Sequence, residues 1–285
     1  MSVNSTYSTL HQLPDLLPPT TGALKSLYNF FDLRRHGPDR FPKEIHAQYI
    51  PPALNHERAL IVVNGMRHTA KEITRIEGVA RHVFKGPLFI IPNLSNGFLA
   101  DFFRAAILRL GGQSPASEAL VHTLQQLDPA LKEIRIVCHS EGALIVRTAL
   151  HHLGKKKFNE LYPKLSIESF GGAIFFNKSY AFKCVNHTSI IDPVPFFFNI
   201  ENAFKYLYAA ALLIKNKMER RLSPVFIGDF CPIVFHPYHS KNPLMEHKFL
   251  TSTYNNLFVN SILNYNSSKY FSCYGDSDPF RKMTP

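Results

Sequence analysis

The stretch that decides the fold is Ile134-Arg135-Ile136-Val137-Cys138-His139-Ser140-Glu141-Gly142-Ala143-Leu144-Ile145-Val146. Its first part is a short apolar run rich in β-branched residues, which is typical of a buried strand. Beyond Ser140, apolar residues recur at helical spacing until Gly154 ends the pattern. The sequence therefore predicts a strand, a tight turn with Ser140 at its apex, and then a helix.

This pattern has the form of a nucleophile elbow, the G-x-S-x-G device that holds a serine strained and exposed between a strand and a helix. The motif here is Cys138-His139-Ser140-Glu141-Gly142, so a cysteine replaces the first glycine. Cysteine is small, although it is not ideal at that position. A strand directly before the motif and a helix directly after it favour an elbow over the alternative, an ordinary strand–helix turn.

Two further apolar runs, at 59–63 and 87–91, are continuous rather than alternating, which is typical of parallel strands buried on both faces. Helices are expected at 70–84 and 115–127, and another strand at 184–191. This alternation of strands and helices predicts an α/β fold with a mainly parallel central sheet flanked by helices.

The chain is expected to contain one such domain, at 45–265. Residues 1–44 are expected to form a partly disordered N-terminal arm, because prolines interrupt them repeatedly. Residues 266–285 are expected to form a loose C-terminal tail. Within the domain, 96–110 predicts an unusually apolar helix, which either is buried or covers an apolar site as a lid; we favour burial.

Composition narrows the classes of partner. The chain has 285 residues, 45% of them hydrophobic, and a formal net charge of +11. Such a charge suits nucleic acid or an anionic membrane surface as partner, but on charge alone a soluble basic surface is the favoured interpretation. No zinc-finger, helix-turn-helix or RNA-recognition signature is present, so nucleic acid is not expected.

The four cysteines are far apart in sequence, which predicts neither a disulfide framework nor a zinc site.

The start of the sequence lacks the basic segment and apolar run of a secretory signal peptide. No apolar run reaches the length of a membrane span. We therefore expect a cytoplasmic protein, or one exported without a cleaved signal peptide.

A serine nucleophile needs an imidazole as base and a carboxylate that orients the imidazole. Asp192 directly follows the expected 184–191 strand. Because the carboxyl ends of parallel strands share one edge of the sheet, Ser140 and Asp192 should face the same crevice. We predict that Asp192 is the acid; the alternative is a turn or capping aspartate.

We predict that His247 is the base, since it lies in a loop just before the last helix, expected at 250–264. The alternative for His247 is a surface histidine. The other candidates for the base are His236 and His239, whose H-x-x-H spacing suggests a metal site. Nothing helical is expected to hold that pair and no convincing third ligand is nearby, so no metal site or cofactor is predicted.

An oxyanion hole needs two backbone N–H groups. One is expected from Glu141, directly after the serine. The other is expected from Gly65-Met66, after the 59–63 strand, where Gly65 permits a sharp bend. The alternative is that Gly65 is a plain turn glycine.

With these residues in place, the chain from about 45 to 264 resembles an α/β-hydrolase of the lipase/esterase kind. Asp192-Pro193-Val194-Pro195 is similar to the acid-bearing loop of class 3 lipases, and Glu246-His247-Lys248-Phe249 to the histidine loop of many hydrolases. The His139-Ser140-Glu141-Gly142-Ala143-Leu144 elbow also resembles that of a chlamydial protein family. This second resemblance supports the fold and does not indicate a substrate. The resemblance implies an α/β-hydrolase-like fold with Ser140, Asp192 and His247 as its triad.

Three functions follow as hypotheses. The first is a serine hydrolase of carboxylic esters, including lipid esters, acting through an acyl-enzyme. The second is a hydrolase-fold protein without catalysis that binds a partner or an anionic membrane surface. The third is an acyltransferase that uses the same triad with an alcohol acceptor.

Overall fold

The computed structural model describes residues 47–50, 57–66, 68–95, 98–189, 192, 194–195, 231–236 and 252–267. The predicted N-terminal arm at 1–44 lies outside the described residues, and so do His239, His247 and most of the predicted tail at 266–285.

Among the described residues, the core of the fold is a seven-stranded sheet with the order β1-β3-β2-β4-β5-β6-β7. β1 pairs with β3 in the antiparallel direction, and every other pair of neighbours is parallel. The mainly parallel sheet confirms the α/β prediction, whereas β1 was not predicted. The strands are β1 (Gln48–Ile50), β2 (Arg58–Val63), β3 (Leu88–Ile91), β4 (Glu133–His139), β5 (Leu165–Phe170), β6 (Lys183–Ser189) and β7 (Ile233–His236).

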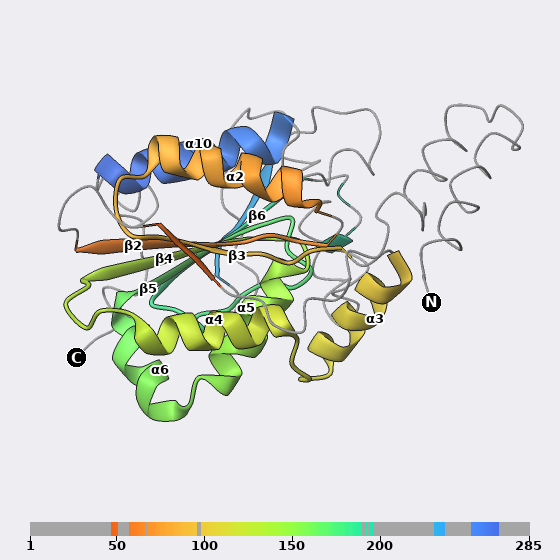
Figure 1. Cartoon of the computed structure of the whole chain (residues 1–285), viewed down its shortest axis with the longest axis horizontal. Helices are drawn as coiled ribbons and strands as arrows, with labels where there is room; N and C mark the ends of the chain where they lie inside the picture. Colours follow the sequence, from red (N-terminus) through yellow and green to blue (C-terminus); the bar gives the residue numbers. More distant parts are fainter. Residues whose placement is uncertain are drawn as a thin grey trace, which may run out of the picture.

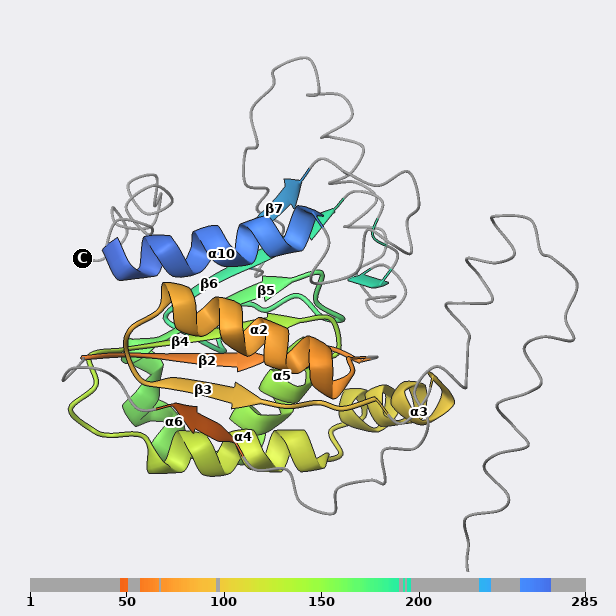
Figure 2. The ribbon, with the colours of Figure 1, turned by 45° about the horizontal axis from the view of Figure 1, so that its top comes forward.

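Helices cover both faces of the sheet (Figure 1). α2 (Ala70–Val83) and α10 (Ser252–Ser267) lie side by side on one face. α4 (Pro115–Gln126), α5 (Gly142–His152) and α6 (Lys155–Leu161) lie on the other, and a 3-10 turn, η3 (Tyr162–Lys164), follows α6. α3 (Phe98–Arg109) projects near the carboxyl ends of the strands, as the second view shows (Figure 2).

Each face of the sheet has its own apolar core, because side chains alternate along every strand. Leu60 and Val62 of β2 point to one side, where Ile76 of α2 and Phe258 of α10 are also buried. Their neighbours along β2 point to the other side, against α4 and α5. With both faces covered, the strands show the continuous apolar runs seen in the sequence.

Local sequence explains where the helices begin. α2 starts with a capping box between Thr69 and Glu72, and α4 starts after Ser114, which forms a second box with Ser117. α5 begins without a side-chain cap. Its first turn directly follows Ser140, so the positive end of this helix lies at the serine.

The predicted burial of the apolar helix is wrong for one face of α3. Phe102, Phe103 and Ile107 are 46%, 64% and 52% exposed. Asp101, Ala105 and Leu108 are buried, and the Leu108 carbonyl accepts a hydrogen bond from Arg147 of α5. Apolar residues extend around most of the helix, but only one narrow stripe of it is buried, so an apolar surface remains exposed.

No helix in the described part of the chain is both long and apolar enough to cross a membrane.

Candidate active site

Ser140 occupies the apex of a strained turn between β4 and α5. Its φ is 56°, the only positive φ at a non-glycine residue among those the structure describes. Its N–H donates to the Phe170 carbonyl at 3.2 Å, and its own carbonyl accepts from Ala143 and Ala173 at 3.1 and 2.9 Å. A left-handed conformation costs a serine about 1–2 kcal/mol, so the surrounding hydrogen bonds must hold it in place.

The turn is tight because two glycines allow a close approach. A Cβ atom at Gly142 would lie 2.6 Å from the Val63 carbonyl oxygen, and one at Gly65 would lie 2.6 Å from the Ser140 Cβ. Gly65 is not among the glycines with a positive φ. The close approach gives Gly65 a steric role, because the Gly65 loop lies directly against Ser140.

Cys138, the departure from the usual motif, does not prevent this turn from forming. Its side chain is fully buried in the core on the α5 side of the sheet. Burial raises the pKa of its thiol to about 12, which keeps the thiol neutral. Cysteine thus serves here as a small apolar residue.

Asp192 lies beyond the end of β6, as predicted, and is buried. Its carboxylate accepts a hydrogen bond from the Tyr254 hydroxyl at 2.5 Å through Oδ2 and from the Val194 N–H at 2.9 Å through Oδ1. Its Oδ2 lies so close to Gly171 that a Cβ atom there would be 2.6 Å away. Tyr254, from α10, was not predicted as part of the site.

The segment Phe170–Gly171 connects the two predicted residues. Ser140 donates to the Phe170 carbonyl, and the Asp192 carboxylate packs against Gly171. The structure therefore brings Ser140 and Asp192 to the same place at the carboxyl edge of the sheet. His247, the predicted base, lies outside the described residues.

Glu141, predicted to donate its N–H to an oxyanion, has a side chain with unexpected partners. Its carboxylate is fully buried and accepts two hydrogen bonds from Arg104 of α3, both at 2.8 Å. Asn93, just after β3, donates to it at 2.7 Å. Burial raises the pKa of Glu141, while Arg104 and Asn93 act in the opposite direction. Sequence reasoning missed this cluster.

A second buried polar cluster crosses the sheet under α10. His187 contacts Glu168 through Nε2 and His236 through Nδ1, both at 2.9 Å. Arg135 lies 3.6 Å from Glu168. Burial by itself raises the pKa of Glu168, but the hydrogen bond and charge of His187 and the charge of Arg135 outweigh burial, so this pKa is lowered. His236, the other candidate for the base among the described residues, thus contacts His187 in this buried cluster.

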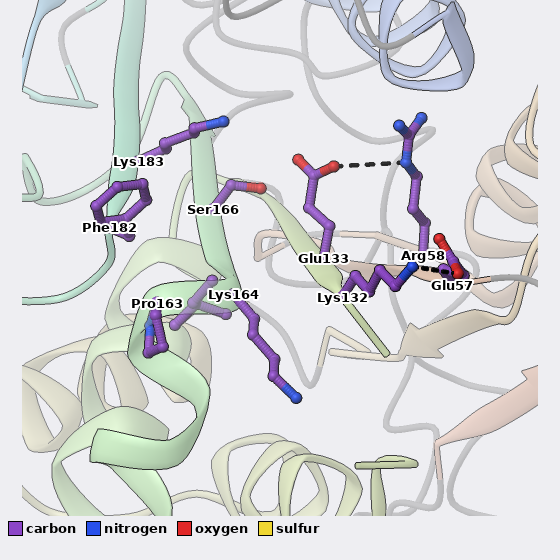
Figure 3. Close-up of a pocket in the computed structure, with 10 residues that line it drawn as sticks. Glu57, Arg58, Lys132, Glu133, Pro163, Lys164, Ser166, Phe182 and Lys183 are labelled. Atoms are coloured by element: carbon purple, nitrogen blue, oxygen red, sulfur yellow. Dashed lines mark ion pairs between the residues drawn. The ribbon is translucent and has the colours of Figure 1, made fainter. Parts of the chain in front are cut away.

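A hollow of about 260 Å³ lies at the amino ends of the strands (Figure 3). Arg58 and Glu133, the first residues of β2 and β4, line it and form an ion pair at 3.6 Å. Lys132 and Glu57 form another at 2.5 Å. The hollow opens at the opposite end of the strands from Ser140, so it belongs to a different surface from the candidate active site.

The strand order, the strand–turn–helix at Ser140 and the position of Asp192 beyond β6 together define an α/β-hydrolase-like fold. The chain is similar to a lipase-esterase related protein from Clostridium acetobutylicum, with a TM-score of 0.29 and 15% identity over 47% of this chain and 49% of that one. It is also similar to Est1E from Butyrivibrio proteoclasticus, with a TM-score of 0.39 and 11% identity over 79% and 93% of the two chains. No family model and no curated protein matches the chain. Because both TM-scores are below 0.5, the fold class rests on the topology itself.

Proposed function

We propose that this protein is a serine hydrolase that cleaves carboxylic esters, with Ser140 as nucleophile, His247 as base and Asp192 as the acid that orients the base. The observation that carries the proposal is the strained Ser140, held at φ 56° between β4 and α5 with the Asp192 carboxylate across the Phe170–Gly171 segment. Strain of this kind persists only where the surrounding structure imposes it, and it is concentrated at functional sites.

The reaction follows from these roles. His247 removes the hydroxyl proton of Ser140 while the serine oxygen attacks the ester carbonyl. The resulting oxyanion is stabilised by the backbone N–H groups of Glu141 and Met66. When the tetrahedral intermediate collapses, the alcohol leaves with the proton from His247 and the acyl group stays on Ser140. A water molecule, deprotonated by His247, then releases the acid and restores the serine.

The exposed face of α3 supports lipid esters as the substrate class. Phe102, Phe103 and Ile107 of α3 are exposed, and α3 lies near the carboxyl ends of the strands (Figure 2). Arg104, on the same helix, bonds to Glu141 next to the nucleophile, so this apolar surface lies close to the candidate site. An acyl chain or a lipid surface is the kind of partner that such side chains suit. The net charge of +11 favours an anionic surface.

The test is hydrolysis of p-nitrophenyl esters of graded acyl length by wild type and by Ser140→Ala. Because Ser140 is only 1% exposed, each ester is assayed with and without detergent micelles and anionic vesicles. We expect release of p-nitrophenol that is lost in Ser140→Ala and increases with acyl length when micelles are present. A folded wild type without activity in all conditions would contradict the proposal and favour the binding protein. Analysis of products with added alcohol separates hydrolysis from acyl transfer.

A further inference from the structure

The polar cluster around Glu141 is continuous with the loop that carries the second predicted oxyanion donor. Asn93 donates its amide to Glu141, and its backbone N–H donates to Asn64 Oδ1 at 2.8 Å. Asn64 Nδ2 in turn donates to the carbonyls of Asn93 at 2.8 Å and Gly65 at 2.9 Å. A chain of hydrogen bonds therefore runs from Arg104 on α3, through the elbow, to the Gly65–Met66 peptide.

This chain determines the direction of the Met66 N–H. No peptide bond in the described part of the chain is cis. In a trans peptide the carbonyl and the N–H point in opposite directions. The Gly65 carbonyl is held by Asn64 and lies 3.1 Å from His68 Nδ1. The Met66 N–H therefore lies in the same peptide plane and points away from the Gly65 carbonyl.

The same reasoning applies to the other donor. The Ser140 carbonyl accepts from the N–H groups of Ala143 and Ala173, so the Glu141 N–H of that peptide points the other way. The Glu141 side chain is meanwhile held by two parallel hydrogen bonds from Arg104, the geometry in which arginine recognises a carboxylate most rigidly. Both donors thus belong to peptides whose remaining polar groups are occupied.

A buried ion pair of this kind is poor evidence for stability, because desolvation offsets most of its attraction. Arg104 also lies 3.1 Å from Asp101, whose carboxylate accepts from Ser95, so the cluster holds two carboxylates and one arginine. Its position, directly beside the turn that carries Ser140, suggests that it serves the geometry of the site.

We propose that Arg104 is a positioning residue for the oxyanion hole: through Glu141, Asn93 and Asn64 it fixes the two backbone N–H groups that receive the developing negative charge. This inference rests on the proposed function, since it assigns a role within the same reaction. Preorganised donors act on the transition state more than on the bound ester. Loss of Arg104 should therefore lower kcat and leave KM nearly unchanged.

The test compares Arg104→Lys, which keeps the charge and loses the planar fork, with Arg109→Lys, the same substitution further along α3. Two rates are measured on wild type and variants: kcat and KM for a short-chain p-nitrophenyl ester, and the second-order rate of labelling by a fluorophosphonate. Both are expressed per active site, titrated with the same probe. For Arg104→Lys we expect both kcat and the labelling rate to fall about 10- to 100-fold, part of the effect of removing one oxyanion donor, with KM within about twofold. Arg109→Lys should match wild type.

Glu141→Gln is the second variant, because it keeps the shape of the side chain if Arg104→Lys fails to fold. It weakens the same contact and should also lower kcat with KM preserved. A structural role alone would lower the titrated fraction of active sites and the free energy of unfolding, but not the rate per active site. A labelled wild type with unchanged rates in both variants would overturn this inference and leave the proposed function standing. A wild type that is neither labelled nor active would overturn the proposed function, and this inference with it.

Discussion

Gly65→Ala tests the close contact between the Gly65 loop and the nucleophile. The new Cβ atom would lie 2.6 Å from the Ser140 Cβ and 2.8 Å from the His139 carbonyl oxygen. Carbon atoms in contact are normally about 3.5–4.0 Å apart, so the loop or the elbow must move by about 1 Å. Because φ at Gly65 is not in the left-handed region, the effect of the substitution is steric alone.

Two magnitudes follow from this displacement. Forcing one extra carbon into a packed site destabilises a protein by about 1–3 kcal/mol. A misplacement of about 1 Å at the reacting groups lowers the rate by about 10²-fold. We therefore expect Gly65→Ala to remain folded, with a free energy of unfolding lower by about 1–3 kcal/mol and a rate of fluorophosphonate labelling lower by about 10²-fold.

The assay measures the labelling rate and a urea unfolding curve for wild type, Gly65→Ala and Gly78→Ala. Gly78 lies within α2, where an added Cβ atom meets nothing within 4 Å. Gly78→Ala should therefore be labelled at the wild-type rate and gain about 0.5–1 kcal/mol of stability, because alanine suits a helix interior better than glycine. Wild-type labelling of Gly65→Ala would refute the contact between the loop and the nucleophile.

Three further predictions concern buried groups. Tyr254→Phe removes the hydroxyl that donates to Asp192; urea unfolding should show a loss of about 1–3 kcal/mol, and an unchanged curve would contradict this role. The pKa of Glu168 is lower in the folded protein than the unfolded value of about 4.3. Near that pH the Glu168 carboxylate binds fewer protons in the folded state than in the unfolded state. Its stabilising contribution is therefore complete above the unfolded pKa and is lost as the pH falls. The difference in unfolding free energy between wild type and Glu168→Gln should shrink as the pH falls below about 4; a difference that grows in acid would have the wrong sign. Cys138, with its pKa raised to about 12, should resist iodoacetamide at about pH 8 until urea unfolds the protein, as followed by peptide mapping, and rapid alkylation of Cys138 in the native protein would show that its thiol is accessible.

The framework of the sheet could be predicted from the sequence because its signals are local. A continuous apolar run such as Ala59–Val63 specifies a strand buried on both faces, and a strand–serine–helix order specifies the elbow. The position of Asp192 followed from one rule, that the carboxyl ends of parallel strands meet at one edge. These predictions needed no knowledge of which side chains touch.

The clusters within the site could not be predicted, because they depend on contacts between distant segments. Arg104 and Glu141 are 37 positions apart and meet only after α3 has packed beside the elbow. One signal was present in the sequence: Asn64 directly follows one buried strand, and Asn93 lies just beyond another, after Pro92. The exposure of Phe103 was missed for a similar reason. The sequence shows that the helix is apolar, but how much of its surface is buried depends on tertiary packing.

The measurement that tests the central claim most directly is fluorophosphonate labelling followed by peptide mapping, on wild type, Ser140→Ala and His247→Ala. The account predicts a phosphonyl group on Ser140 in the wild type, with labelling lost in both variants, because a serine is a weak nucleophile without its base. No labelling of folded wild type, with and without micelles, or a phosphonyl group on a residue other than Ser140, would contradict the account.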